Sequence, residues 1–548
     1  MAPYQNRCRA NHVAEWSFRS DVERADPFNE ITLDLMVTGP DGHERAVPAF
    51  WAGGSAWGAR YASPTPGTYR WRTRCSDAGD AGLHGLAGEL EVTAGEDEPN
   101  PLLRHGPIRV AADRRHLEHA DGTPFLWLGD TWWMGLCRRL RWPDDVRELA
   151  ADRSAKGFNV IHLVAGLYPD MDPFDERGAG DGGFPWAEDF STINPAYFDA
   201  ADVRIAHLVR CGMVPCVVGF WGYFLDVAGA DVLKAHWRNL IARWGAYPVA
   251  WCVAGEALMP FYTSEANREM KRRIFRGEPW LPADRRAVWS DMSRYIKATD
   301  GHGRLLTIHP TRVGTDQVDD PTTMDLHWLQ TGHNGYPATA QAVDMMEKAL
   351  AAEPRMPVLD SEGNYEMIRG TNRDDIQRFQ FWSTMLVGAA GYSYGANGIW
   401  QVDRSDRPYG ASPHGTTWGG RPWDEAMSFP GSTQVGVGKR ILERFAWWRF
   451  EPHPEWVDPA QDAEDRHQPY AAGIDGGVRV IYVPCEVMKP VAACRLEPGR
   501  TYRAELIDPS TGEAHDLGEV RGDAEDRWAM PQTPAFHDWV LVLTPSGS

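Results

Sequence analysis

Several features that mark common protein classes are missing from the 548 residues of this chain. Nowhere do about 18 apolar residues follow one another, as they would in a membrane-spanning helix. The first residues, Met-Ala-Pro-Tyr-Gln-Asn-Arg-Cys, contain no apolar segment of the kind found in signal peptides. We therefore expect a cytoplasmic protein without a membrane partner, with a secreted chain trimmed of its signal peptide as the alternative.

Motifs that bind metals or nucleotides are missing as well. The eight cysteines form no Cys-x-x-Cys pair, and Cys211 and Cys216, the closest two, are separated by four residues. We expect them to be reduced and mostly buried thiols. No Gly-x-Gly-x-x-Gly or P-loop motif directly follows any apolar run that could be a strand. The sequence therefore predicts no metal and no other cofactor.

Positively charged residues are fewer than negatively charged ones. The chain has 56 Lys and Arg against 76 Asp and Glu, which gives a formal charge of −20 and a pI near 5.4. Nucleic acid would be repelled by such a chain, whereas a neutral or small substrate would not. The abundant residue is Trp, with 25 copies, whose indole faces stack on sugar rings as well as filling cores. Nothing in the charge decides the oligomeric state.

Two β-rich regions are predicted at the ends of the chain. Residues 1–97 alternate in polarity at 31–37 and 67–73 with turn residues between, which is typical of a small immunoglobulin-like sandwich. The acidic, Pro-containing stretch 95–101 reads as a linker. Residues 435–548 open with a predicted helix at 437–448 and then alternate at 477–483, 502–507 and 539–543, which indicates a second sandwich.

Residues 105–434 have a different pattern, in which short apolar runs alternate with helical stretches, as in parallel βα units. Helices are expected at 143–156, 196–211, 230–246 and 374–388. Eight strands are expected at 125–129, 159–164, 213–218, 249–254, 305–308, 324–328, 357–360 and 391–394. Eight strands in about 300 residues fit a TIM barrel better than an open doubly wound sheet. The predicted fold is therefore α/β, a (β/α)8 barrel between two β-sandwiches.

Glu256 and Glu362 each follow one of these predicted strands, the fourth and the seventh. The carboxyl ends of all barrel strands face one pocket, so we expect the two side chains to converge across it. A pair of carboxylates in such a pocket is the machinery of glycoside hydrolysis. The alternative is that each Glu caps a helix or pairs with an Arg, and Asp130, Asp360 and Glu366 compete for the same roles.

Longer stretches of this sequence resemble a known family. Residues 122–133, 156–161, 357–366 and 388–400, together with Arg378, are similar to the apiosidase-like (DUF4038) glycoside hydrolase barrels. Residues 29–38 and 69–73 resemble the DUF5060 sandwich that often precedes such barrels. Residues 477–484 and 508–513 resemble the small C-terminal β-sandwich of the collagen-binding type. The likeness covers nearly the whole chain.

This resemblance implies a retaining enzyme in which Glu256 is the acid/base and Glu362 the nucleophile. Residues 254–256, Ala-Gly-Glu, stand where the family has Gly-Gly-Asp, and residues 360–363, Asp-Ser-Glu-Gly, stand where it has Asp-Gly-Glu-Pro. The resemblance also implies a terminal β-linked sugar as substrate, apiose or a related pentose or hexose, on plant glycans or glycosides. Family membership alone does not fix the sugar.

Polar and aromatic side chains near the predicted strand ends are candidates for binding sugar hydroxyls. They are Asp130, Trp132, His162, Trp221, Tyr223, His309, His327, Gln330, Tyr394 and Trp400. For each His, a purely structural role is an even alternative. A metal held by His309, His327 and His333 is a minor alternative that the reaction does not require. The loops 168–186 and 403–423 are long and aromatic and are expected to shape the pocket.

The functional hypothesis is therefore a retaining β-glycosidase acting on a carbohydrate or a small glycoside. One rival is a catalytically inactive carbohydrate-binding protein, which predicts that an Arg sequesters one carboxylate and that no pocket joins the two. Another is an inverting or transglycosylating enzyme that uses the same pair. The separation of the carboxyl groups discriminates retention from inversion.

Overall fold

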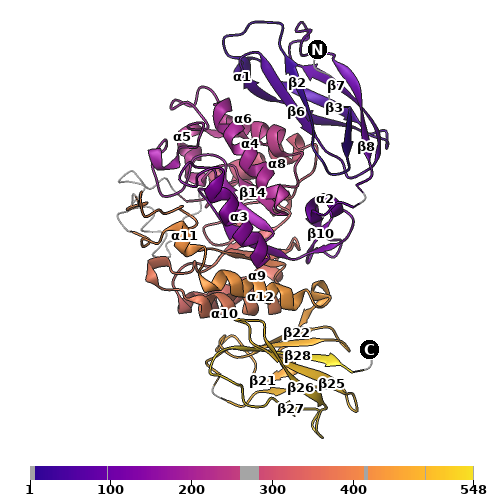
Figure 1. The fold of residues 1–548 in the computed structure, drawn as a ribbon, viewed down its shortest axis with the longest axis vertical. Helices are drawn as coiled ribbons and strands as arrows, with labels where there is room; N and C mark the ends of the chain where they lie inside the picture. Colours follow the sequence, from indigo (N-terminus) through magenta and orange to yellow (C-terminus); the bar gives the residue numbers. More distant parts are fainter. Residues whose placement is uncertain (1–5, 96, 260–282, 413–416, 488, 547–548) are drawn as a thin grey trace.

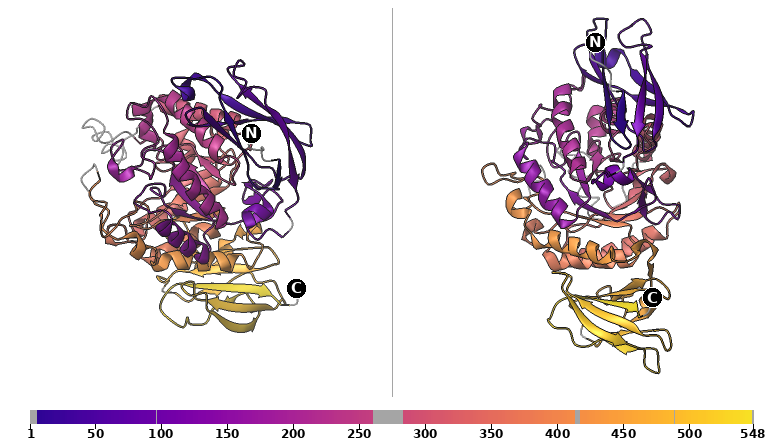
Figure 2. Two further views of the ribbon diagram at one scale, coloured as in Figure 1. Left: turned by 45° about the horizontal axis from the view of Figure 1, so that its top comes forward. Right: turned by 45° about the vertical axis from the view of Figure 1, so that its right-hand side comes forward.

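A computed structural model of the chain describes residues 6–95, 97–259, 283–412, 417–487 and 489–546. A barrel with its surrounding helices lies in the middle, with N-terminal β-sheets at one end and C-terminal β-sheets at the other (Figure 1). Figure 2 shows the same order from two further directions. Residue 96, in the predicted linker, lies outside the described residues.

The central sheet has eight parallel strands, which confirms the predicted barrel class. Its order is β16-β15-β14-β13-β12-β19-β18-β17. In sequence order the strands are β12 (Trp127–Thr131), β13 (Val160–Val164), β14 (Val214–Val218), β15 (Ala250–Cys252), β16 (Leu306–Thr307), β17 (His327–Gln330), β18 (Val358–Glu362) and β19 (Gly391–Tyr394). Their apolar runs are buried on both faces, as expected for strands with helices outside and a packed interior within.

Two predicted strands are shifted. The first was expected at 125–129, but Pro124–Phe125 forms β11, which pairs with β10 (Leu117–His119) and, through it, with β9 (Ile108–Val110) outside the barrel. The barrel strand begins two residues later. The sixth was expected at 324–328 but runs at 327–330, because Asp325 instead bonds back to β16. Both shifts arise because residues of the predicted strand pair with another segment instead, Phe125 with β10 and Asp325 with β16.

The barrel closes between β16 and β17 without a strand ladder. The amide of Asp325 donates to Leu306 O at 2.8 Å, and the Leu306 amide donates to Oδ2 of Asp325 at 2.9 Å. Oγ1 of Thr307 donates to Leu326 O at 3.1 Å. We call this junction the seam, and side chains carry much of its bonding.

Helices cover the outside of the barrel. Helix α3 begins with Asp144 and Asp145, whose charge suits a helix N-terminus, and ends where Gly157 adopts φ 93°. Helix α4 begins with Asn194 as N-cap and Pro195 at N1. Within the described ranges, the helices after the N-terminal region are α2 (Pro101–His105), α3 (Asp144–Lys156), α4 (Pro195–Arg210), α5 (Leu225–Ala228), α6 (Ala230–Trp244), α8 (Ala283–Thr299), α9 (Tyr336–Leu350), α10 (Asp374–Leu386), α11 (Trp423–Ala426) and α12 (Pro430–Leu442).

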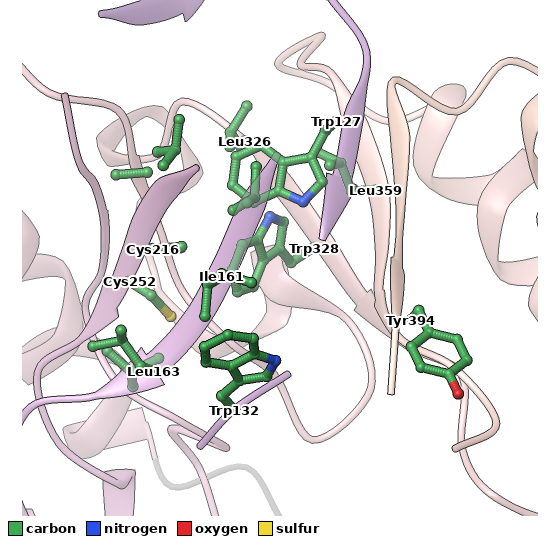
Figure 3. Close-up of a cluster of buried hydrophobic side chains, with 14 of the residues drawn as sticks. Trp127, Trp132, Ile161, Leu163, Cys216, Cys252, Leu326, Trp328, Leu359 and Tyr394 are labelled. Atoms are coloured by element: carbon green, nitrogen blue, oxygen red, sulfur yellow. The ribbon is translucent and has the colours of Figure 1, made fainter. Parts of the chain in front are cut away.

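Aromatic rings fill the barrel interior (Figure 3). Trp127 and Trp328 meet edge to face with ring centroids 6.1 Å apart. The imidazole of His162 stacks on Trp328 at 4.8 Å with an interplanar angle of 10°. Leu326 and Leu359 lie beside the two indoles in Figure 3. The barrel interior is therefore a packed core that supports the carboxyl ends of the strands.

The N-terminal region contains two sheets, as predicted for a sandwich. One has the order β1 (Arg7–Arg9), β8 (Ala87–Thr93), β7 (Gly67–Cys75), β3 (Leu33–Thr38), β4 (Glu44–Pro48), and the other β2 (Ala14–Arg19), β6 (Ala56–Tyr61), β5 (Phe50–Gly53). A short helix, α1 (Pro27–Glu30), precedes β3. Arg60 anchors this region to the barrel, because it donates to Arg243 O at 2.8 Å and pairs with Asp202 at 2.7 Å.

The C-terminal region also contains two sheets. Their orders are β20 (Glu451–Pro452), β22 (Tyr470–Gly473), β23 (Arg479–Val483), β28 (Trp539–Pro545), β25 (Tyr502–Ile507), β26 (Ala514–Val520), and β21 (Val457–Asp458), β24 (Ala492–Ala493), β27 (Trp528–Ala529). The preceding helix was predicted at 437–448, but α12 runs at 430–442 because Pro430 starts it earlier. This helix packs against α10 of the barrel, so the predicted boundary at 434/435 falls inside it.

All eight cysteines are free, and Cys75, Cys137, Cys216, Cys252 and Cys494 are buried. Among the described residues, no helix combines the length and the apolar character needed to cross a bilayer.

Candidate active site

A cavity of about 430 Å³ opens at the carboxyl ends of the barrel strands. Five of the predicted site residues line it, namely Glu256, Glu362, Trp221, Gln330 and Trp400. Its size is within the usual range for small-ligand sites, roughly 300–1,000 Å³. The two carboxylates proposed from the sequence therefore face one space.

Glu256 is held at the cavity by the backbone that continues beyond β15. The amide of Gly255 donates to Phe220 O at 2.7 Å, and that of Ala257 donates to His309 O at 3.2 Å. Glu256 itself adopts φ 37°, a left-handed conformation that is uncommon for residues other than glycine. Its carboxylate is half-buried and accepts a hydrogen bond at 3.1 Å from Nε1 of Trp221.

Gly255 makes this arrangement possible. A Cβ at this position would lie 2.2 Å from the Trp221 ring, so the indole rests directly on the glycine backbone. Any side chain at 255 would displace Trp221 and remove its hydrogen bond to Glu256. The residue before the carboxylate is thus dictated by the packing of the ring that orients it.

Glu362 reaches the cavity because β18 contains a bulge. On the neighbouring strand, Leu329 pairs with Asp360, but the next residue, Gln330, pairs with Glu362, so Ser361 is the extra residue. A strand alternates its side chains between two faces, and one extra residue reverses the alternation beyond it. Asp360 consequently points toward α10, whereas Glu362 points into the cavity beside Gln330.

The surroundings of Glu362 stabilise its charged form. Burial alone would raise the pKa of this carboxyl, but its contacts with His309 and His333 and their charges hold the pKa well below its usual range. Oε1 lies 3.0 Å from Nε2 of His333, and Oε2 lies 3.1 Å from Nε2 of His309. Glu362 is therefore an ionised carboxylate at neutral pH, only 5% exposed.

Gln330 connects the two carboxylates. Its Nε2 donates to Oε1 of Glu256 at 3.2 Å and to Oε1 of Glu362 at 2.9 Å. Because both oxygens contact one nitrogen, they are no more than about 6 Å apart. The pair is close enough for one sugar ring to contact both groups.

The three competing carboxylates lie outside the cavity. Asp130 is fully buried and pairs with Arg153 of α3 at 2.6 Å. Burial raises the pKa of Asp360 to about 7, although Gln380 and Thr331 donate hydrogen bonds to it. Burial also raises the pKa of Glu366 to about 7, although Tyr394 and the Gly431 amide donate to it.

Several predicted sugar-binding residues are placed elsewhere, which corrects their expected position. Trp132 donates to Asp130 at 2.7 Å and does not line the cavity, and Tyr223 donates to Tyr168 O at 3.3 Å. The Tyr394 ring lies apart from the Trp127–Trp328 cluster in Figure 3, with its hydroxyl bonded to Glu366.

The three predicted histidines do not line the cavity either. His162 is stacked in the barrel core, where burial lowers its pKa to about 3. His327 contacts Thr315 at 3.2 Å, and burial lowers its pKa to about 4. His309 lies 3.1 Å from Glu362 but does not itself line the cavity. In the described part of the chain, no three His, Cys, Asp or Glu side chains are arranged to hold a metal.

Other lining residues were missed in the sequence. Trp133, one position beyond the predicted Trp132, lines the cavity and donates to Tyr365 at 3.0 Å. Asp170 accepts from Nε1 of Trp418 at 2.5 Å, which joins the two predicted pocket loops. The second of these loops includes residues 413–416, outside the described residues. Arg312 lies at the cavity in the loop before β17, and no sequence signal distinguished it.

The barrel, the cavity and the carboxylate pair together define a glycoside hydrolase. Residues 111–449 match the catalytic domain described as apiosidase-like, so the chain belongs to the apiosidase-like family. Residues 7–76 match a domain of unknown function, DUF5060. No curated protein matches the chain.

Solved structures with the same fold are distant in sequence. A family 5 glycoside hydrolase from Bacteroides vulgatus is similar at a TM-score of 0.66 and 20% identity, over 82% of this chain and 95% of that one. A second B. vulgatus protein, described as a candidate glycoside hydrolase, is similar at a TM-score of 0.68 and 16% identity, over 99% of this chain and 100% of that one. The likeness extends to the whole three-part fold.

Proposed function

We propose that this chain is a retaining glycosidase that removes a terminal β-linked sugar, apiose or a related pentose or hexose, from plant glycans or glycosides. The observation that carries the proposal is the bridging amide of Gln330, which holds the carboxylates of Glu256 and Glu362 within about 6 Å of each other. Retaining pairs are ~5–5.5 Å apart and inverting pairs ~6.5–9.5 Å. The short separation supports a direct attack over activation of an intervening water.

In the first step, Glu256 transfers its proton to the glycosidic oxygen while a carboxylate oxygen of Glu362 attacks the anomeric carbon. The carbon–oxygen bond to the leaving group breaks, and the leaving group departs as an alcohol. The low pKa of Glu362 keeps its carboxylate ionised for this attack. His309 and His333, which stabilise that charge, therefore position the nucleophile.

In the second step, Glu256, now a carboxylate, takes a proton from water, and the water oxygen attacks the same carbon. The ester bond to Glu362 breaks, the sugar leaves with its original anomeric configuration, and both groups regain their starting protonation states. Trp221, hydrogen-bonded to Glu256, fixes its position on the cavity wall.

The rival binding-protein reading predicts an Arg that sequesters one carboxylate and separate pockets for the two. Glu362 is surrounded by Gln330 and two histidines and contacts no arginine among the described residues. Both carboxylates line the same cavity. These observations support catalysis.

The test has two stages. A panel of aryl and natural β-glycosides, apiosides included, identifies the sugar that wild type releases. An activated 2-fluoro glycoside of that sugar is then expected to add its glycosyl mass to the peptide that contains Glu362. Glu366→Gln, altered outside the cavity, should still be labelled, whereas Glu362→Gln should not. Release of sugar with inverted configuration and no labelling would favour the inverting alternative.

A further inference from the structure

The C-terminal sandwich contacts the helix that begins beside the candidate active site. Strand β22 packs on α10 (Figure 1), and the segment before β22 contributes His467, which contacts the first turn of α9. The loop that leads into α9 lines the cavity with residues 331–334, whereas His467 itself does not line it. The start of α9 is therefore shared between the sandwich and the cavity.

His467 holds this helix start through a ring contact and a chain of hydrogen bonds. Its imidazole stacks on Tyr336, the first residue of α9, with ring centroids 4.6 Å apart and an interplanar angle of 19°. Nε2 lies 3.0 Å from Oγ1 of the buried Thr339, and that hydroxyl donates to Tyr336 O at 2.6 Å. Because Thr339 has a single hydroxyl proton, Nε2 of His467 is assigned as the donor between them.

The same helix start borders the cavity on its other face. Gln341 lines the cavity and follows Thr339 by two residues, which is about 200° around the helix. On the barrel side, the Gly335 amide donates to Oδ1 of Asn364 at 3.0 Å, and Nδ2 of Asn364 donates to Gly335 O at 3.2 Å. The chain is thus fixed by the barrel at Gly335 and by the sandwich at Tyr336, so the two attachments are one residue apart.

His333 lies three residues before Tyr336 and depends on this loop for its position. Its Nε2 lies 3.0 Å from Oε1 of Glu362, and its Nδ1 lies 3.3 Å from the amide nitrogen of Tyr365. A hydrogen bond from nitrogen to oxygen spans about 2.7–3.2 Å. A shift of the ring by about half an ångström would therefore take the contact with Glu362 beyond the hydrogen-bonding range.

We propose that His467 is a positioning residue through which the C-terminal sandwich supports the reaction at Glu362. It fixes the start of α9 and, with it, the loop that carries His333. His333 in turn stabilises the charge on Glu362. This inference rests on the proposed function, in which Glu362 is the nucleophile. It gives the sandwich a part in catalysis, although none of its described residues lines the cavity.

The first test measures kcat/KM against pH on the glycoside that wild type cleaves. His467→Ala removes both the ring and the donor, so kcat/KM should fall about three- to fivefold, with the acid limb moved to higher pH because the charge on Glu362 is less stabilised. His467→Gln keeps an N–H donor and should recover part of the loss. Arg466→Gln is the matched control, because Arg466 pairs with Asp344 and Glu347 farther along α9, and it should leave the profile as in wild type.

The second test asks whether the effect passes through His333. In the His333→Phe background, His467→Ala should cause no further loss, since the two side chains act in one chain of contacts. Additive losses in the double variant would overturn the proposal. Equal losses in Arg466→Gln and His467→Ala would also overturn it, because docking of the sandwich in general would then be responsible.

Hydrogen–deuterium exchange of the full chain without substrate supplies a readout that does not depend on hydrolysis. Exchange in the segment 331–339 should be faster in His467→Ala than in wild type and unchanged in Arg466→Gln. Unchanged exchange there in His467→Ala would overturn the proposal even if the glycosidase activity is found. Faster exchange in a chain that cleaves no glycoside would instead refute the proposed function and retain the contact. Equal unfolding midpoints of His467→Ala and Arg466→Gln exclude loss of fold as the cause.

Discussion

The two faces of strand β18 carry acidic residues with opposite properties. On the cavity face, Glu362 is surrounded by two histidines and an amide and has a pKa well below its usual range. On the face toward α10, Asp360 accepts only neutral donors and has a pKa of about 7 because burial dominates. Burial alone therefore does not decide the charge of a carboxyl group. The donors that accompany burial decide it.

The largest effect is expected from removing the cavity-side carboxylate. Glu362→Gln deletes the proposed nucleophile but keeps a side chain of the same shape, and kcat/KM should fall on the order of 10⁴-fold or more. Glu366→Gln changes a buried carboxyl behind the wall and should retain activity close to wild type. Steady-state kinetics on the glycoside that wild type cleaves measure both. Equal losses in the two variants would argue against a special role for the carboxylate in the cavity.

The next largest effect concerns Glu256 and depends on the leaving group. Glu256→Gln removes the proposed acid and should slow cleavage of alkyl glycosides by about 10²–10⁴-fold. Glycosides of dinitrophenol need no protonation, so their first step should proceed and the glycosyl enzyme should accumulate as a burst. A loss independent of the leaving group would argue against Glu256 as the acid.

A smaller effect is expected from weakening the charge stabilisation of Glu362. His333→Phe keeps the ring beside Tyr365 but removes a hydrogen bond, so the pKa of Glu362 should rise. The acid limb of kcat/KM against pH should therefore move to higher pH, with about a tenfold loss at its midpoint. His327→Phe, whose partner Thr315 lies outside the cavity, serves as control and should leave the limb in place.

The smallest effect concerns stability on the other face. Because the pKa of Asp360 rises from 3.8 to about 7 on folding, the folded state retains a proton that the unfolded state loses. This contribution is fully present below pH 3.8 and disappears as pH increases through about 7.

Asp360→Asn is neutral at every pH, so the unfolding midpoint should decline less steeply between about pH 4 and pH 7 than in wild type. Thermal unfolding followed across that range measures the slope. Asp375→Asn, at an exposed position on α10, is the matched control and should reproduce the wild-type slope. An unchanged slope in Asp360→Asn would show that burial does not perturb this carboxyl in solution.

The sequence predicted the barrel, its two flanking sandwiches and the strand-end carboxylates, because apolar runs and turn residues report local structure directly. Which of two adjacent residues faces the cavity was harder to predict from the sequence. Trp132 was chosen and Trp133 lines the cavity, since adjacent residues at a strand end point in opposite directions. Local patterns carry no information on which of the two faces inward once a strand ends.

The bulge at Ser361 could not be predicted from the sequence either. The sequence Asp-Ser-Glu is compatible with both carboxylates on one face of the strand. Only the pairing with β17 shows that Ser361 is the extra residue of a bulge. His309, which contacts Glu362, belongs to another βα unit, and Arg153, which neutralises Asp130, lies on the helix that follows its strand. Such partners are set by tertiary packing. The sequence alone therefore could not decide whether each acidic residue lies in the cavity or pairs with another side chain.

The seam between β16 and β17 has a consequence for the geometry of the carboxylate pair. One arc of the barrel wall from Glu256 to Glu362 runs through consecutive strand ladders, and the other crosses the seam, where Thr307 and the Asp325 side chain replace a ladder. The wall is thus most compliant in the shorter arc that separates the two groups. Gln330, on β17 at the edge of this seam, acts there as a spacer, because its amide sets the width across the least rigid sector of the barrel.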